Sequence, residues 1–520
     1  MSAVTTRGHV RDHREQRGGQ DPAQGYRVGT AASAGVWLGL GAGRVAALGF
    51  GVVATIVLLA AHAGFALACL PLAVTAGLTF IPIAGRPLAG WISPLVGQSV
   101  ATMSGTTRWT ADLPAIPTEP HATPRGPDER DRPAAGRLAL PGPCGRAWWT
   151  QLHDSLTGAH VGVLHDTHAS ITRTDRSRTQ TAGSAVTVCF AVTGVDRFGL
   201  LDTDGQDRLA LSWGRVLAAF AAPERRITHL QLTERVAVGE TDLTTAKNWA
   251  RDRTPQPHVA SRVVSQDSLC EQIAASTVRR DSLLTVRLAR TLDDADLLAR
   301  LRDVAMDLLT ADLLARPLST DELHAMIGRA LHPGEHTPHS GLQERPAPLS
   351  CRTEWDAVRV DDAFHRGFAI TGWPASPVPA CWLGGLSLSP PPVGARTLAI
   401  HLTPVPAPTA QRMARAARAR ADLDRADRRR FGLADSAADD HAAFESASMQ
   451  AELVAGHATH RIAAVLTCST AQQSELADAT RGLRDTAAAA GLSVRAVHGQ
   501  HQHALTAALP LARLRFGGTS

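Results

Sequence analysis

The sequence predicts a membrane-anchored α+β protein, in which an N-terminal two-helix transmembrane hairpin precedes a cytosolic α+β body of two lobes. Three observations lead to this fold class. Residues 45–85 contain no Asp, Glu, Lys or Arg, in a chain that is 19% charged. Eight prolines crowd residues 111–143, a density that neither helix nor strand tolerates. The rest of the chain alternates between runs rich in β-branched residues and segments with helical spacing.

The N-terminal part is expected to contain a tail and a membrane region. Residues 1–25 are polar and have nothing to bury, so they predict a disordered tail. Residues 26–108 form the membrane region. The break at residues 62–64 divides its uncharged stretch into transmembrane helices at about 45–61 and 65–83, each roughly 26–28 Å long against a hydrocarbon core of roughly 30 Å. An interfacial segment is expected at 87–105. A buried core hairpin is the alternative interpretation.

The distribution of charge predicts the topology. Residues 1–108 carry eight Arg and three acidic residues, a net charge of 8 − 3 = +5, which equals the net charge of the whole chain. Positive charge on both flanks places both ends of the hairpin in the cytoplasm, and thus predicts a two-pass protein of the cell membrane. Four arginines are expected to set this topology: Arg27, Arg44, Arg86 and Arg108. The neutral remainder argues against broad nucleic-acid binding.

The body is divided by its composition. A Pro-rich linker is expected at 109–143, a first lobe at 144–332, a second linker at 333–350 and a second lobe with a long helical pair at 351–516. Strands are expected at 185–195, 227–238, 283–288, 368–371, 397–402, 460–468 and 492–497. Helices are expected at 206–222, 295–314, 409–431, 437–455 and 471–490, with another after the capping residues Ser319 to Glu322. The self-similarity of the two lobes is too weak to assert a repeat.

The sequence lacks the common motifs of catalysis. Its single lysine, Lys247, lies between Ala246 and Asn248, so there is no G-x-x-x-x-G-K-[S/T] loop and P-loop ATP hydrolysis is excluded. There is no G-x-S-x-G elbow and no H-E-x-x-H helix. The seven scattered cysteines form no C-x-x-C pair, which suits free thiols in a reducing compartment. The sequence therefore predicts no catalytic residues, no cofactor and no enzymatic activity.

Two groups of polar residues are weak candidates for metal binding. His498, His501 and His503 could supply two or three imidazoles, although a solvated loop is the favoured interpretation. His332, Glu335, His336 and His339 form a similar set in the second linker. The aspartates between Asp202 and Asp207 resemble a calcium loop, but the glycine comes too early, and a helix N-cap explains them better.

One predicted helix is rich in arginine. The segment 409–431 carries eight arginines, interleaved with three aspartates, and the helix that follows is acidic. The candidate contacts to nucleic acid or to a partner are Arg412, Arg415, Arg418 and Arg425. Two arms of complementary charge packed against each other are the favoured interpretation, and direct contact with nucleic acid is the less favoured one.

Several short segments, taken in order, resemble a known family. They are Tyr26–Gly29, Ile83–Leu88 with Trp91, Gly105–Trp109, Phe198–Asp202, Phe368–Pro374, His457–Arg461 and Ala508–Leu511. Together they resemble a family of actinobacterial membrane proteins associated with conjugation-like type IV secretion. In that family a PrgI-like helical hairpin is fused to a region similar to the non-motor N-terminal domain of the secretion assembly ATPase. The resemblance covers the chain from Tyr26 to about Phe516, and order and spacing carry it.

The resemblance implies a function and partners. It implies a non-enzymatic, membrane-anchored structural component of a type IV secretion apparatus, oligomeric within a complex. Its partners would be a separate cytosolic secretion ATPase, other subunits of the apparatus and membrane lipid. The E component of the type VII secretion membrane complex, which also has two N-terminal helices, is the alternative. A DNA-handling accessory protein and a membrane-tethered enzyme are minor alternatives.

Overall fold

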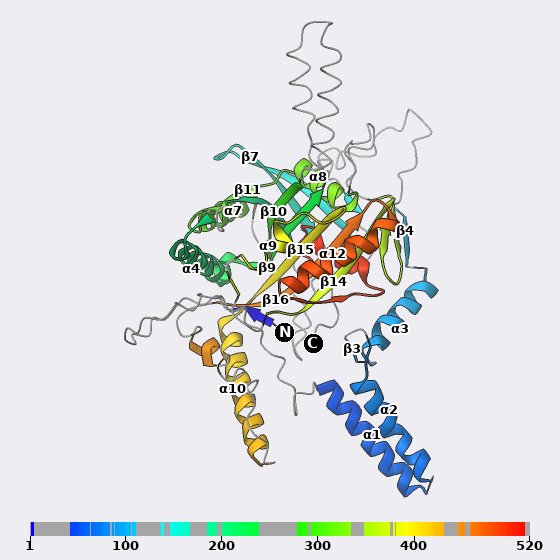
Figure 1. Cartoon of the computed structure of the whole chain (residues 1–520). Coiled ribbons are helices and arrows are strands. Elements are labelled where there is room, and N and C mark those ends of the chain that lie inside the picture. Colours follow the sequence, from blue (N-terminus) through cyan, green and yellow to red (C-terminus); the bar gives the residue numbers. More distant parts are fainter. Residues whose placement is uncertain are drawn as a thin grey trace, which may run out of the picture.

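The architecture is described from a computed structural model of the whole chain (Figure 1). The structure describes residues 2–4, 42–62, 64–83, 86–87, 89–105, 107–110, 137–139, 146–166, 185–194, 200–238, 278–289, 293–333, 348–374, 378–379, 381–430, 444, 447–451, 453 and 458–514. In this part of the chain an antiparallel sheet forms the body, and helices cover both of its faces. The sheet combines strands from both predicted lobes.

The sheet follows the order β4-β12-β13-β14-β16-β15-β9-β10-β8-β7-β6-β5, with β1 beside β16, β11 beside β8 and β17 beside β14. Its strands are β1 Ser2–Val4, β4 Arg108–Thr110, β5 Arg137–Ala139, β6 Arg146–Asp154, β7 Ala159–Asp166, β8 Ala185–Thr193, β9 Ile227–Val238, β10 Val278–Ala289, β11 Leu314–Pro317, β12 Ser350–Thr353, β13 Val358–Val360, β14 Ala363–Gly372, β15 Ala395–Val405, β16 Thr459–Thr470 and β17 Ser493–Ala496. A separate two-stranded pair joins β2 Pro82–Ile83 to β3 Arg86–Pro87.

The helices are α1 Ala42–Ala60, α2 Phe65–Phe80, α3 Ala89–Met103, α4 Thr203–Phe220, α7 Asp294–Leu309, α8 Thr320–Leu331, α9 Gly384–Ser387, α10 Ala407–Arg430, α12 Leu476–Ala489 and α13 His501–Ala508. Side-chain caps fix where several of them begin. Asp202 accepts a hydrogen bond from the backbone N–H of Gly205 at 2.9 Å, as the N-cap interpretation predicts. Ser319 and Glu322 form the predicted capping box of α8.

The body consists of two split βαβ units. The first unit runs β8-α4-β9-β10-α7-β11, and its strands lie in the order β11-β8-β10-β9. The second runs β14-α9-β15-β16-α12-β17, in the order β17-β14-β16-β15. Both have the β-α-β-β-α-β connectivity of ferredoxin-like units, with the fourth strand beside the first. A further helix follows each unit, α8 after the first and α13 after the second. The fold is therefore an internal repeat.

The two units are joined edge to edge. Strands β9 and β15 pair antiparallel from Leu230↔Leu402 to Ala237↔Ala395, without a register shift. Since each is the second strand of its unit, the joint brings equivalent edges together and merges the units into one sheet. Neither edge is left open at the centre of the molecule, which removes two unpaired edges.

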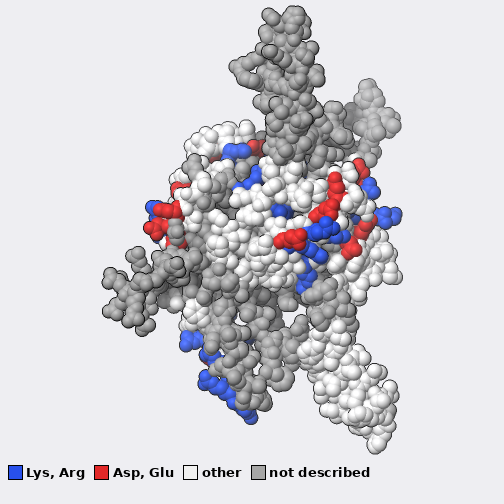
Figure 2. All heavy atoms as spheres, in the orientation of Figure 1, with Lys and Arg blue, Asp and Glu red and all other residues white. Residues whose placement is uncertain are grey.

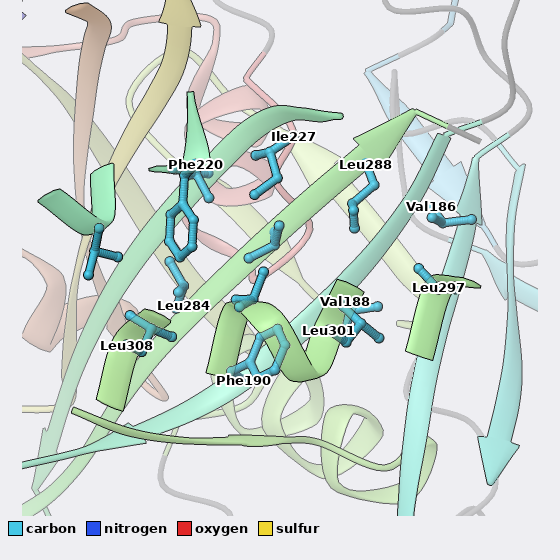
Figure 3. Packing of buried hydrophobic residues seen from close by; sticks show 14 of the residues in the cluster. Val186, Val188, Phe190, Phe220, Ile227, Leu284, Leu288, Leu297, Leu301 and Leu308 are labelled. Atoms are coloured by element: carbon cyan, nitrogen blue, oxygen red, sulfur yellow. The ribbon is translucent and has the colours of Figure 1, made fainter. Parts of the chain in front are cut away.

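One face of the sheet is covered by α4 and α7 in the first unit. The inward residues of β8 and β10 meet Phe220 of α4 and the leucines of α7, as Figure 3 shows for the labelled side chains. Val186, Val188 and Phe190 lie opposite Leu288, Val286 and Leu284 in the β8–β10 register. These residues are two apart along each strand and so share one face of the sheet, while the buried residues between them lie on the other face. In the second unit, α9 and α12 cover the same face over Phe368, Leu398 and Leu466.

The other face is covered by α8, α13 and the chain after α13. Gly367 of β14 allows α13 to approach closely, because a Cβ atom there would lie 2.2 Å from the Cβ of Ala504. Leu509 and Leu511 then reach the core of the first unit and pack with the leucines of α8. The C-terminal part of the second unit therefore completes the core of the first.

Gln231 of β9 fixes this crossing segment by hydrogen bonds. Its side chain is fully buried. Its Nε2 donates to the carbonyl oxygens of Ala507 at 3.1 Å and Leu509 at 2.8 Å, and its Oε1 accepts from the N–H of Ala512 at 2.8 Å. One side chain of the first unit thus satisfies three buried backbone groups of the second.

The structure confirms an α+β body, but the prediction of membrane-spanning helices is wrong. None of the helices in the part of the chain that the structure describes combines the length and the apolar character that a membrane crossing needs. Helix α2 has 16 residues, about 24 Å, and contains Pro71. Helix α1 includes Arg44, after which 16 residues remain. Both apolar lengths are short of a hydrocarbon core of about 30 Å.

This finding corrects several expectations together. The transmembrane helices at 45–61 and 65–83 are the shorter helices α1 and α2, because the first ends at Ala60 and the second at Phe80. The membrane anchor and the two-pass location at the cell membrane are wrong, and the placement of both ends in the cytoplasm, which depended on two crossings, has no remaining basis. The expected interfacial segment 87–105 contains α3, which contacts the body.

We expect Gln231→Leu to destabilise the body by about 2–4 kcal/mol, because the substitution leaves buried carbonyl and N–H groups without a partner. Denaturant unfolding followed by circular dichroism measures the change. Gln473→Ala, at an exposed side chain, is the control and should change the free energy of unfolding by less than about 0.5 kcal/mol. Equal stability of Gln231→Leu and the control would contradict the role assigned to Gln231.

Candidate functional site

The most unusual surface of the molecule is the hairpin formed by α1 and α2. Large apolar side chains point outward from both helices: Phe50, Val53, Ile56, Val57, Phe65, Leu67, Leu70, Val74 and Phe80. Phe50 is 71% exposed and Phe65 is 77% exposed. Figure 2 shows the hairpin extending away from the body, with no Lys, Arg, Asp or Glu on its visible surface. A contiguous apolar surface of this kind marks an interaction site.

Small residues at the helix–helix contact explain why the large ones face outward. Gly51 of α1 faces Thr75 of α2 so closely that a Cβ atom on Gly51 would lie 2.1 Å from Thr75 Oγ1. Ala68 is fully buried in the same hairpin. The hydroxyl group of Thr75 donates to the carbonyl oxygen of Pro71 at 2.9 Å, so this hydroxyl group is satisfied within its own helix. The hairpin is therefore held by close backbone approach, and its large side chains remain available to a partner.

Helix α3 links the hairpin to the body through an aromatic cluster. Trp91 of α3 lies 5.4 Å from the ring of His498 and 6.1 Å from the ring of Trp355, measured between centroids. Trp355 and His498 stack at 5.6 Å with an interplanar angle of 19°. Trp355 lies in the turn between β12 and β13, and His498 in the turn between β17 and α13. We call Trp91, Trp355 and His498 the α3 latch.

Polar contacts hold the body side of the latch in place. His498 Nδ1 lies 2.8 Å from Asp356 Oδ1. The N–H of Gly499 donates to the carbonyl oxygen of Trp355 at 2.9 Å, and Gly499 has φ of 69°, a conformation that favours glycine. The two turns that receive Trp91 are thus tied to each other by contacts that do not involve α3.

The predicted histidine cluster has a structural role in this region. His501 is fully buried, and its Nδ1 accepts a hydrogen bond from the N–H of Gly367 at 3.1 Å. Its ring lies 6.0 Å from that of His498. His503 lies on α13 two residues after His501 and is half-buried. In the described part of the chain no three His, Cys, Asp or Glu side chains are grouped so that they could hold a metal ion.

Of the second histidine set, His332, Glu335, His336 and His339, the structure describes only His332. His332 Nε2 lies 3.0 Å from Asp361 Oδ2, and this contact ties the end of α8 to the β13–β14 turn. Glu335, His336 and His339 lie outside the described residues. Asp361 also accepts a hydrogen bond from the N–H of Ser350 at 2.6 Å. Burial raises the pKa of the Asp361 carboxyl group, but the hydrogen bonds from His332 and from the backbone outweigh it and lower this pKa below its ordinary value.

Three of the four arginines expected to set a membrane topology are described. Arg27 is outside the described residues, Arg44 lies in the first turn of α1, and Arg86 and Arg108 begin β3 and β4. Arg108 is exposed and pairs in the sheet with Arg352 of β12.

The arginine-rich segment is the projecting helix α10, which follows β15 (Figure 1). Of the four candidates, Arg412, Arg415 and Arg418 are exposed and Arg425 is half-buried. Arg418 Nη1 donates to Gln450 Oε1 at 3.1 Å, so a segment of the predicted second arm does lie against α10. Most acidic residues of that arm are outside the described residues, and the charge pairing of the two arms stays a prediction.

Sequence reasoning missed the body side of the latch and the buried histidines. Trp355 and Asp356 carry no motif, since only the turn between β12 and β13 brings them to His498. Burial lowers the pKa of His365 and His501 to about 3, and that of His401 and His460 to about 4. These four histidines are therefore neutral in the folded protein near pH 7.

Comparison with known proteins adds no relative: no protein-family model and no curated protein matches this chain. The chain is therefore described by its fold and by the two elements that project from it. It has an antiparallel α+β body of two ferredoxin-like units, from which an apolar hairpin and an arginine-rich helix project. The hairpin is the candidate docking site on this body.

We expect the free energy of unfolding to fall as the pH is lowered from about 6.5 towards 4. The unfolded chain protonates its histidines near pH 6.5, whereas His365, His401, His460 and His501 stay neutral in the folded protein until pH 3–4. The unfolded state then binds more protons, and each such histidine contributes up to about 1.4 kcal/mol per pH unit. Denaturant titrations at several pH values measure the slope.

His501→Asn tests one contribution to that slope. Asn Oδ1 can replace Nδ1 as the acceptor for Gly367 N–H, so the fold is retained while the titrating group is lost. The slope should decrease by about 1.4 kcal/mol per pH unit. His153→Asn, at an exposed position of β6, is the matched control. An unchanged slope for His501→Asn would contradict the assignment.

We expect Trp91→Ala to release α3 from the body, because Trp91 supplies the ring that packs on His498 and Trp355. Amide hydrogen exchange within residues 92–103 should accelerate about tenfold or more. Ile92→Ala removes a neighbouring side chain that is 52% exposed, and it should leave the exchange of α3 unchanged. Equal acceleration in both variants would show that the latch does not hold α3.

Proposed function

We propose that this chain is a non-enzymatic structural component of a type IV, conjugation-like secretion assembly. In this role the α1–α2 hairpin docks against neighbouring subunits of the assembly, and the double ferredoxin-like body offers a platform to a separate ATPase. The observation that carries the proposal is the outward apolar surface of the hairpin. Water is an unfavourable environment for such a surface, and a partner that covers it gains about 25 cal/mol for each Å² of apolar area buried.

The way in which the hairpin is mounted supports a docking role. The α3 latch fixes the connection between the hairpin and the body through three rings. A hairpin held in this way loses less conformational freedom on binding than a free arm would, and such preorganisation favours affinity. The body supports the role of a platform, because its two units share one sheet and one crossing C-terminal segment.

Three of the segments that resemble secretion proteins lie in the parts that this role uses. Trp91 belongs to the latch, and Phe368 and Ile370 of β14 are core residues of the second unit. Ala508 ends α13, and Leu509 and Leu511 of the crossing segment pack under α8. The resemblance thus concerns the mounting of the hairpin and the joint between the units. The proposal of a type IV assembly rests on this resemblance, and the proposal of a partner rests on the exposed apolar surface of the hairpin.

Site-specific photo-crosslinking in the native cell tests the proposal. A photoreactive residue at Phe65 should form adducts with subunits of a type IV assembly, which mass spectrometry identifies by sequence. The same residue at Met306, 61% exposed on α7, is the control for a surface away from the hairpin. An assembly ATPase with a phosphate-binding loop should co-purify with the full chain. Adducts with lipid alone, or with type VII subunits, would contradict the proposal.

A further inference from the structure

We propose that the outer face of α10 binds the phosphate backbone of duplex nucleic acid without sequence preference. This activity is separate from the docking role of the hairpin. Among the side chains of α10 that the structure describes, six exposed ones are arginines and one is acidic, Asp422. The exposed arginines are Arg412, Arg415, Arg418, Arg420, Arg429 and Arg430. Figure 2 shows this positive charge along the projecting helix.

The position of α10 makes the face accessible. The helix follows β15 directly and extends away from the sheet for 24 residues, about 36 Å (Figure 1). Ala410 and Ala414 are buried on its inner side. The arginines from Arg412 to Arg430 therefore extend over about 27 Å of the outer side. The outer side of α10 is therefore locally positive, although residues 109–520 as a whole carry no net charge.

Four of these arginines, Arg412, Arg415, Arg418 and Arg420, meet no carboxylate in the described part of the chain, and Arg418 donates to the neutral side chain of Gln450. Arg415 and Arg420 form no hydrogen bond or ion pair within the described part of the chain. Arg412 donates only to groups of its own first turn, the carbonyl oxygen of Pro408 and the hydroxyl group of Thr409. By contrast, exposed arginines of the body stand beside carboxylates. Arg481 lies 2.9 Å from Asp478, and Arg359 lies 3.1 Å from Asp362.

The composition of the face favours phosphate over an acidic protein. Protein interfaces are centred on aromatic and apolar residues and are poor in charge at their core. The exposed face of α10 has no aromatic residue, and Leu423 is its one exposed large apolar side chain. Guanidinium groups bind phosphate oxygens with two parallel hydrogen bonds. A helix of about 10–12 Å diameter also fits the major groove of B-DNA, which is about 12 Å wide.

The same composition predicts how the binding should behave. Without aromatic side chains the helix lacks the main stacking platform for exposed bases, so a duplex rather than a single strand is the expected ligand. Contacts to phosphates carry no sequence information by themselves. The affinity should therefore depend strongly on salt and little on sequence, because each neutralised phosphate releases condensed counterions.

Fluorescence anisotropy with labelled 30-bp DNA duplexes of two unrelated sequences tests the proposal on the full chain. The test variant is Arg412→Ala, Arg415→Ala and Arg418→Ala together, since alanine preserves the helix. Binding should weaken at least tenfold at low salt. The slope of log K against log salt should become shallower by about 2.7, which corresponds to three phosphates at about 0.9 each. Circular dichroism verifies that the variant retains its helix content.

A charge-matched control makes the result specific. Arg352→Ala, Arg359→Ala and Arg481→Ala remove the same charge from exposed positions of the body, each beside a carboxylate. This control should retain the affinity and the salt slope of the unaltered chain. Equal weakening in both triple variants would overturn the proposal. So would the absence of salt-dependent duplex binding, or polyglutamate competing as well as unlabelled duplex, which would assign the face to an acidic protein.

Discussion

The pairing of β9 with β15 is the contact on which the rest of the structure depends. Eight residue pairs, from Leu230↔Leu402 to Ala237↔Ala395, join two units that would each otherwise have an open edge. Because the pairing is continuous, the inward residues of both units lie on the same face of one sheet. Four helices can then cover that face, and α8 and α13 cover the other. The internal repeat is thus converted into a single body.

The crossing C-terminal segment ties the two units together on the other face of the sheet. Gln231 of the first unit satisfies backbone groups that follow α13 of the second, while Leu509 and Leu511 fill the core under α8. His401 strengthens the same region through its contact with the carbonyl oxygen of Ala507 at 2.9 Å. The core of the first unit is therefore completed by the second. The histidines of this interior stay neutral because burial opposes their charged form.

Two projections give the body its distinct surfaces. The hairpin presents apolar side chains and α10 presents arginines, so the same chain offers one surface suited to burial against a partner and another suited to polyanions. Their connections to the body differ accordingly. The hairpin is mounted through α3 and its aromatic latch, whereas α10 continues directly from the central strand β15.

Much of the body could be predicted from the sequence alone. Runs rich in β-branched residues and helical spacing located β8, β9, β15, β16, α4, α7, α10 and α12, because those patterns are local in the chain. The caps at Asp202 and Ser319 likewise depend on residues three apart. Lack of charge between Arg44 and Arg86 established an apolar hairpin, but not its length or surroundings. Only the tertiary structure showed that the helices are too short to cross a membrane, that Trp91 meets Trp355 and His498, and that two units share one sheet. These features join residues far apart in the chain, so no local pattern records them.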